Sequence, residues 1–86
     1  MYIVVVYDIN QKCGAKIMRL CRQYLEHVQN SVFEGEITNS NYKEFCGKIK
    51  EIMDVDFDSV IIYELWKAHF KRVIIGIEKR DINNII

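Results

Sequence analysis

The chain has 86 residues, half of them hydrophobic, and its twelve basic and twelve acidic side chains cancel. A domain of this size forms one core, and zero net charge argues against a uniform attraction to nucleic acid or membranes, so any attraction must come from local clusters of charge. Three cysteines without a CxxC spacing argue against a disulfide framework or a zinc site. Because the sequence shows neither a targeting peptide nor a membrane span, we expect a cytoplasmic protein with no membrane partner.

The first expected element is a β-strand at residues 2–7. Ile3 to Tyr7 form an unbroken β-branched and aromatic run, which is typical of a strand covered on both faces or buried in an interface. Asp8 follows directly. An aspartate at this place either caps the next turn or, with a second carboxylate beside it, holds a divalent cation, and the residues alone leave both interpretations open.

An amphipathic helix is expected from Cys13 to Glu26. Its apolar positions Cys13, Ile17, Leu20, Cys21 and Tyr24 recur at helical spacing, and Val28, just beyond its end, continues the period. The other face carries a basic stripe, which consists of Lys12, Lys16 and Arg19 and is interrupted by no acidic residue. Such a stripe is either an ordinary solvated helix face or a contact for nucleic-acid phosphates. On the apolar faces of this helix and of the next one, Cys21 and Cys46 are expected to be small buried hydrophobes.

A β-hairpin is expected next. Val28 to Phe33 form its first strand, and the turn at residues 34–36 contains Gly35, which takes a positive φ readily, before a short strand returns. Asn30 and Ser31 make the first strand unusually polar. These two residues either position the end of the neighbouring strand or satisfy each other's hydrogen bonds inside an interface.

A second helix is expected from Asn41 to Met53. Apolar residues recur there at helical spacing, and Asn41 with Glu44 has the spacing of a capping box. The helix leads into an acidic loop at residues 54–58.

Two more strands are expected at residues 60–66 and 72–77, with a connection at residues 67–71. Glu64 carries the only charge of the first of these strands, and we expect it to point into solvent or to form an ion pair. Residues 78–86 are expected to be a loosely held tail that orders on a partner.

The order of expected elements is strand, helix, strand, strand, helix, strand, with one strand appended. This order predicts an α+β fold, the ferredoxin-like βαββαβ arrangement over residues 1–77, in which two helices pack on one face of an antiparallel sheet. The additional C-terminal strand is apolar, and an unpaired apolar edge invites association. We therefore expect that strand to be exchanged or paired across a homodimer.

Three segments carry a resemblance to a known family. They are the hydrophobic strand that ends in Tyr7 and Asp8, the block from Gln29 to Gly35, and the segment from Asp58 to Tyr63. With these segments the chain resembles the CRISPR-associated protein 2 family, the small endonucleases of spacer acquisition. The resemblance implies a ferredoxin-like homodimer in which the two copies of Asp8 face each other across the dyad and share a divalent metal, Mg2+.

The resemblance also implies partners, namely two dimers of the CRISPR integrase and a duplex DNA prespacer, with RNA as an alternative substrate. Many relatives carry an arginine-rich segment after the aspartate, whereas the cations here are Lys12, Lys16 and Arg19. Lysine keeps the charge but lacks the bidentate fork of arginine. These three residues are the candidate nucleic-acid contacts.

Four further residues are candidates for supporting Asp8: Tyr7, Asn30, Ser31 and Phe33. Phe33 either packs in the core or an interface, or stacks on a base.

Two functions of different classes fit this sequence. One is an architectural dimer that bridges integrase dimers and carries a prespacer. The other is a magnesium-dependent endonuclease in which Asp8 is both metal ligand and catalytic residue. A third hypothesis is a toxin-like endoribonuclease of the same fold that acts without an integrase, since fold alone does not fix function.

Overall fold

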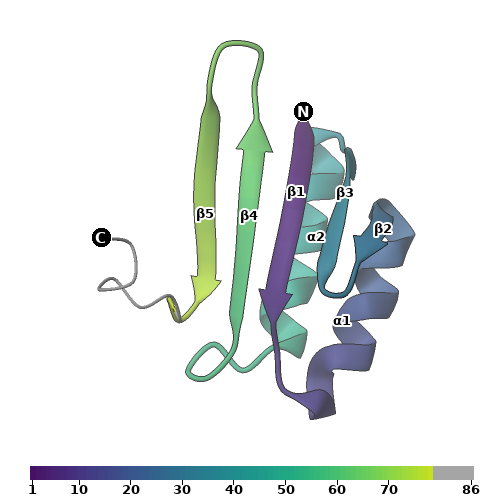
Figure 1. Cartoon of the computed structure of the whole chain (residues 1–86), viewed down its shortest axis with the longest axis vertical. Helices are drawn as coiled ribbons and strands as arrows, with labels where there is room; N and C mark the ends of the chain where they lie inside the picture. The colour runs from purple at the N-terminus through teal and green to yellow at the C-terminus, as the bar shows by residue number, and fades with distance from the viewer. Residues whose placement is uncertain (79–86) are drawn as a thin grey trace.

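Five strands and two helices make up the computed structural model, which describes residues 1–78. The elements are β1 (Tyr2–Asp8), α1 (Gln11–Tyr24), β2 (Glu26–Gln29), β3 (Val32–Glu36), α2 (Asn39–Ile52), β4 (Ser59–Leu65) and β5 (Phe70–Gly76). All strands join one antiparallel sheet in the order β2-β3-β1-β4-β5, as Figure 1 shows. This arrangement confirms the predicted ferredoxin-like fold. The expected tail, apart from Glu78, lies outside the described residues.

The additional strand β5 pairs with β4 of its own chain. The ladder runs over the whole length of both strands, from Ser59 opposite Gly76 to Leu65 opposite Phe70. Because β5 is the last strand in the sheet order, its outer edge faces away from the rest of the sheet. The pairing of this edge across a homodimer stays a prediction.

Both helices lie on the same face of the sheet (Figure 1). We call this the covered face and the opposite one the open face. Alternating residues of β1 point to each side, so Ile3 and Val5 are fully buried on the covered face whereas Val4 and Val6 are only half-buried on the open face. The helices complete the core with Ile17, Leu20, Cys21, Phe45 and Ile49. Burial of Cys21 confirms the expectation of a small buried hydrophobe, whereas Cys46 of α2 is only partly buried.

The hairpin between the helices turns earlier than the sequence predicted. The turn consists of Asn30 and Ser31, and Asn30 takes the positive φ, at 42°, a conformation that asparagine tolerates better than most residues. Gly35 instead lies inside β3, where a Cβ atom would come within 3.3 Å of Leu25 Cδ2. The predicted turn at residues 34–36 is therefore wrong, and the glycine serves close packing.

Both helices begin two residues before the expected positions. In α1 the side chain of Asn10 accepts a hydrogen bond from the Cys13 backbone N–H at 3.3 Å. In α2 Thr38 is the N-cap, and its hydroxyl accepts from the Asn41 N–H at 3.2 Å. Asn41 therefore donates its backbone N–H to the N-cap residue and is not the N-cap itself, so the predicted capping box is wrong. Neither helix in residues 1–78 has the length and apolarity needed to cross a bilayer.

Glu64 is buried and hydrogen-bonded, not solvated. Its carboxylate accepts from the Tyr42 hydroxyl at 2.6 Å and from the Trp66 indole N–H at 3.3 Å. Two neutral donors thus replace the expected solvent or ion-pair partner. Burial, together with this hydrogen bond, raises the pKa of Tyr42.

Candidate metal and nucleic-acid site

Asp8 is the last residue of β1, the central strand of the sheet, and its side chain is exposed. Strand alternation places Asp8 on the same side as Val4 and Val6, which is the open face. In the ladder with β4 it lies opposite Ser59. The candidate metal ligand therefore stands at the rim of the uncovered sheet surface.

A second aspartate, Asp58, fixes the turn that follows Asp8. Its carboxylate is 1% exposed and accepts hydrogen bonds from the backbone N–H of Asn10 at 3.2 Å and of Asp54 at 2.9 Å. One side chain thus joins the β1–α1 turn to the loop before β4. Sequence reasoning placed Asp58 in an acidic loop and missed this role, because the pattern of charges carries no signal for a carboxylate that folds back onto backbone amides.

The end of β5 packs against the same aspartate. Gly76 has a φ of 91°, and a Cβ atom there would lie 2.1 Å from the Asp58 carbonyl oxygen. The next residue, Ile77, donates its backbone N–H to that carbonyl at 2.9 Å. Only glycine fits this contact, since a side chain would meet backbone and not a movable group.

The four candidate supporting residues gather at this end of β1, but in structural roles. The Tyr7 N–H donates to the Ser31 carbonyl at 3.1 Å, and the carbonyl oxygen of Asn30 accepts from His27 Nε2 at 2.7 Å. Phe33 is fully buried, with the rings of Tyr7 and His27 at centroid distances of 6.2 and 4.6 Å. Burial raises the pKa of Tyr7. Phe33 therefore packs in the core and does not stack on a base, and the turn residues act through their backbone carbonyls.

The basic stripe runs along α1, on the helical side of the molecule. Lys12 lies in the first turn of the helix, four residues after Asp8, and Lys16 and Arg19 follow along its length; all three are exposed. Lys16 and Arg19 also line a groove of about 430 Å³ between α1 and α2, together with Lys48. The structure brings only Lys12 to the Asp8 end of the sheet, while the other two cations occupy a separate surface.

Magnesium usually takes one or two carboxylates and completes its oxygen shell with water and phosphate. Residues 1–78 of one chain contain no group of three His, Cys, Asp or Glu side chains that could hold a metal. Asp8 provides one carboxylate at the rim, and the Asp58 carboxylate is turned inward to backbone amides. The donor set fits a divalent metal only if two copies of Asp8 come together.

The open face carries a continuous apolar row across four strands. In the ladders Val6 lies opposite Val32 on one side and Ile61 on the other, and Ile61 lies opposite Ile74. All four side chains are partly accessible. A single antiparallel sheet that faced water would instead show polar residues on its outer side. The row is therefore a surface suited to burial against another molecule.

Comparison with known proteins agrees with this architecture. The family model for CRISPR associated protein Cas2 matches residues 1–73. The chain is 44% identical over 86 residues to the CRISPR-associated endoribonuclease Cas2 of Thermococcus kodakarensis, with 100% of both chains covered. It is 46% identical over 88 residues to the protein of the same name from Methanocaldococcus jannaschii, covering 100% of this chain and 76% of the relative. The crystal structure of Streptococcus pyogenes Cas2 superposes with a TM-score of 0.72 at 33% identity, over 78% of this chain and 88% of that one.

Proposed function

Because the chain belongs to the CRISPR associated protein Cas2 family, we propose that it acts in CRISPR adaptation as a homodimer that cleaves nucleic acid at two Asp8 residues brought together across the dyad. The observation that carries this proposal is the position of Asp8 at the rim of an apolar sheet face that neither helix of residues 1–78 covers. Burial of that face against a second copy would bring both carboxylates to one place.

The dimer follows from the energetics of the open face. Val6, Val32, Ile61 and Ile74 adjoin one another and keep part of their surface accessible to water. Each 100 Å² of apolar surface removed from water contributes about 2.5 kcal/mol, from which the entropy lost on association is subtracted. Two identical faces satisfy each other in an isologous contact, with the sheets roughly 10 Å apart.

The chemistry follows from the paired carboxylates. Two Asp8 side chains repel each other, and a divalent cation relieves that repulsion. When bound, Mg2+ would polarise a phosphate and lower the pKa of a bound water. Asp8 of each chain would hold the metal, and Lys12 would neutralise a neighbouring phosphate. The relatives from Thermococcus and Methanocaldococcus are named endoribonucleases, so RNA is the first substrate to test and DNA the second.

An architectural role is the second candidate, and one observation favours it. A single chain offers one carboxylate at the site and no three-ligand cluster among residues 1–78, whereas its basic stripe suits sequence-independent contacts with phosphates. In this role the dimer bridges two integrase dimers and carries a duplex DNA prespacer, and the integrase performs the chemistry. Both candidates need the same dimer.

Asp8→Asn separates the two roles. If the chain is a nuclease, this substitution abolishes magnesium-dependent cleavage of a labelled RNA or DNA strand by the isolated dimer, because the metal loses both anionic ligands. If the role is architectural, prespacer integration by the assembled complex stays near the wild-type level. Asp56→Asn is the matched control, since Asp56 is an exposed acid in the loop that Asp58 anchors. Loss of integration by a dimeric Asp8→Asn protein would defeat the architectural role.

Ile61→Glu tests the dimer itself. A charge in the centre of the apolar row should give a folded monomer, because two buried carboxylates would face each other across the dyad. Sedimentation should report half the wild-type mass and circular dichroism an intact fold. Val55→Glu, at a loop residue that is 47% exposed, should leave the dimer unchanged. A wild-type protein that sediments as a monomer would refute the proposal.

The basic stripe is tested by the double substitution Lys16→Ala with Arg19→Ala. Binding to all duplexes should weaken alike. The slope of log K against log salt should become less negative by about two, because two phosphates are no longer neutralised by the protein. Lys43→Ala with Lys50→Ala, on the exposed side of α2, is the matched control. A weakening that depends on the DNA sequence would contradict binding through phosphates.

A further inference from the structure

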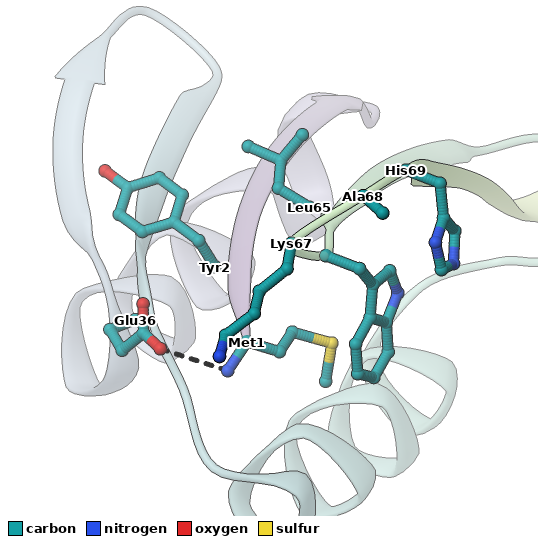
Figure 2. Close-up of a pocket in the computed structure, with 8 residues that line it drawn as sticks. Met1, Tyr2, Glu36, Leu65, Lys67, Ala68 and His69 are labelled. Carbon is teal, nitrogen blue, oxygen red and sulfur yellow. Dashed lines mark hydrogen bonds and ion pairs between the residues drawn. The ribbon is translucent and has the colours of Figure 1, made fainter.

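A pocket lies under the connection between β4 and β5, at the end of the sheet away from Asp8. It encloses about 730 Å³, and its walls include Met1, Tyr2, Leu65, Trp66, Lys67 and His69. Figure 2 shows the labelled side chains of Met1, Tyr2, Leu65 and His69 around this pocket, with Lys67 extending toward Met1. A volume of this size is typical of pockets that take a small organic group.

Trp66 is the rigid element of this pocket. Its indole is 43% exposed, yet its N–H is fixed by Glu64 at 3.3 Å and its ring lies near-parallel to that of His69, at 14° and 6.2 Å between centroids. The backbone N–H of Trp66 also closes the turn by donating to the His69 carbonyl at 2.8 Å. A large aromatic surface held open to solvent binds a flat ligand at low cost in conformational entropy.

The charges around the indole favour an anionic ligand. Lys67 is the next residue after Trp66 and Lys71 lies opposite Glu64 in the ladder, and both lysines are exposed residues of the same hairpin. Two acids also face this region. Glu36 is bound by the amino group of Met1 at 3.0 Å, and Glu64 is buried beneath its two donors. Glu64 is buried and Glu36, although exposed, is paired with the Met1 amino group, so the exposed charges on the hairpin itself are the two lysines.

From this combination we infer that the β4–β5 hairpin is a second nucleic-acid site, in which an unpaired base of an RNA or DNA strand stacks on Trp66 and its phosphates contact Lys67 and Lys71. An exposed aromatic ring flanked by cations is the usual platform for single strands, because every base offers a π face while the cations follow the backbone. Bases inside a duplex are already stacked and cannot use it.

This site is distinct from the one at Asp8. The two lie at opposite ends of β1, whose six residue steps span roughly 20 Å. The inference therefore needs neither the metal nor a cleavage reaction, and it adds a preference for unpaired strands to the proposed function. It would hold for an architectural dimer as well as for a nuclease.

Trp66 is the only tryptophan of the chain, so its fluorescence reports on the site in the unmodified protein. Short oligouridylate and oligothymidylate strands should quench the emission, because a stacked base deactivates the indole. A blunt duplex and an abasic strand with the same number of phosphates should not. Equal quenching by the abasic strand, or none by either single strand, would overturn the inference. The two single strands also tell whether the site prefers RNA or DNA.

Substitutions give a second readout by anisotropy of a labelled single strand. Trp66→Ala should weaken binding at least about fivefold, the lower range for loss of one stacked base, whereas Trp66→Tyr should retain most of the affinity. The matched control is Phe57→Ala, since Phe57 is 68% exposed but lies between the acids Asp56 and Asp58. Unchanged affinity in Trp66→Ala would overturn the inference and leave the aromatic surface for a protein partner.

Two more variants keep this result separate from the function at Asp8. Asp8→Asn should show wild-type quenching even when cleavage is lost. Trp66→Tyr combined with Phe57→Trp moves the reporter to the acidic loop, where single strands should leave the emission unchanged. Quenching of the displaced reporter would overturn the inference, because the signal would then not depend on the hairpin.

Discussion

The two faces of the sheet carry similar apolar residues but differ in how deeply those residues are buried. On the covered face, Ile3, Val5 and Ile62 are fully buried beneath the two helices, whereas Val6 and Ile61 on the open face keep part of their surface accessible. A small domain buries a smaller fraction of its surface than a large one, so its stability depends on a small core. The comparison teaches that the first face holds the chain folded, while the second is available for assembly and carries the candidate site at its rim.

The largest expected effect is on the covered face. Phe45→Ala should lower the free energy of unfolding by about 3–5 kcal/mol, because a fully buried ring leaves a cavity between α2 and the sheet. Phe57→Ala, at a residue that is 68% exposed, should change it by less than about 0.5 kcal/mol. Urea unfolding measures both. A similar loss in the two variants would mean that the core does not lie where the structure places it.

Alkaline pH should also act through the covered face. Burial raises the pKa of Cys21 from 9.0 to about 12, so between these values the unfolded chain releases a proton that the folded chain keeps. The free energy of unfolding should therefore be unaffected below pH 9 and fall as the pH rises toward 12, by at most about 4 kcal/mol. Urea unfolding across this range tests it. Cys21→Ala should lose this part of the pH dependence and Cys13→Ala should keep it.

A matched pair of valines compares the two faces directly. Val5→Ala should cost about 2 kcal/mol at every protein concentration, since two methyl groups leave a sealed core. Val6→Ala should cost little in the dilute monomer but should weaken the dimer, so its effect should grow with concentration. Thermal unfolding over a dilution series separates the two. Identical concentration dependence in both variants would contradict the assignment of the open face to an interface.

The smallest expected effect concerns the rim. If two Asp8 carboxylates meet at the dyad, Asp8→Asn should tighten the dimer by about 1 kcal/mol in the presence of a chelator, because the repulsion between like charges is removed. Added salt should reduce the gain. Sedimentation equilibrium measures the dissociation constant. A dimer that is weaker in Asp8→Asn would show that the carboxylates do not face each other.

Periodicity alone was sufficient for the architecture. The β-branched run before Asp8 and the helical spacing of Ile17, Leu20 and Cys21 gave the order of elements, because burial of one face imposes these periods. Details that depend on a single contact could not be predicted from the sequence. Gly35 indicated a turn, yet it lies in a strand because Leu25 packs against it, and the positive φ belongs to Asn30.

The candidate site likewise has features that the sequence predicts and features that it does not. The position of Asp8 at a strand end followed from the sequence, and the structure confirms that position. The anchoring of its turn by Asp58 and the fixed indole of Trp66 did not, since each depends on hydrogen bonds that the pattern of residue types does not encode. Glu64 was predicted to be solvated or ion-paired for the same reason, because its two donors come from α2 and from the hairpin.

The contact of Gly76 and Ile77 with Asp58 connects the end of β5 mechanically to the turn after Asp8. A partner that pulled on the chain beyond Glu78 would load the ion pair of Glu78 with Arg72, at 2.8 Å, together with the hydrogen bond from Ile77 to the Asp58 carbonyl. The carboxylate of that same residue grips the turn after Asp8 through the Asn10 amide. Part of the tension on this end of β5 would thus reach the turn after Asp8 through a single residue, Asp58.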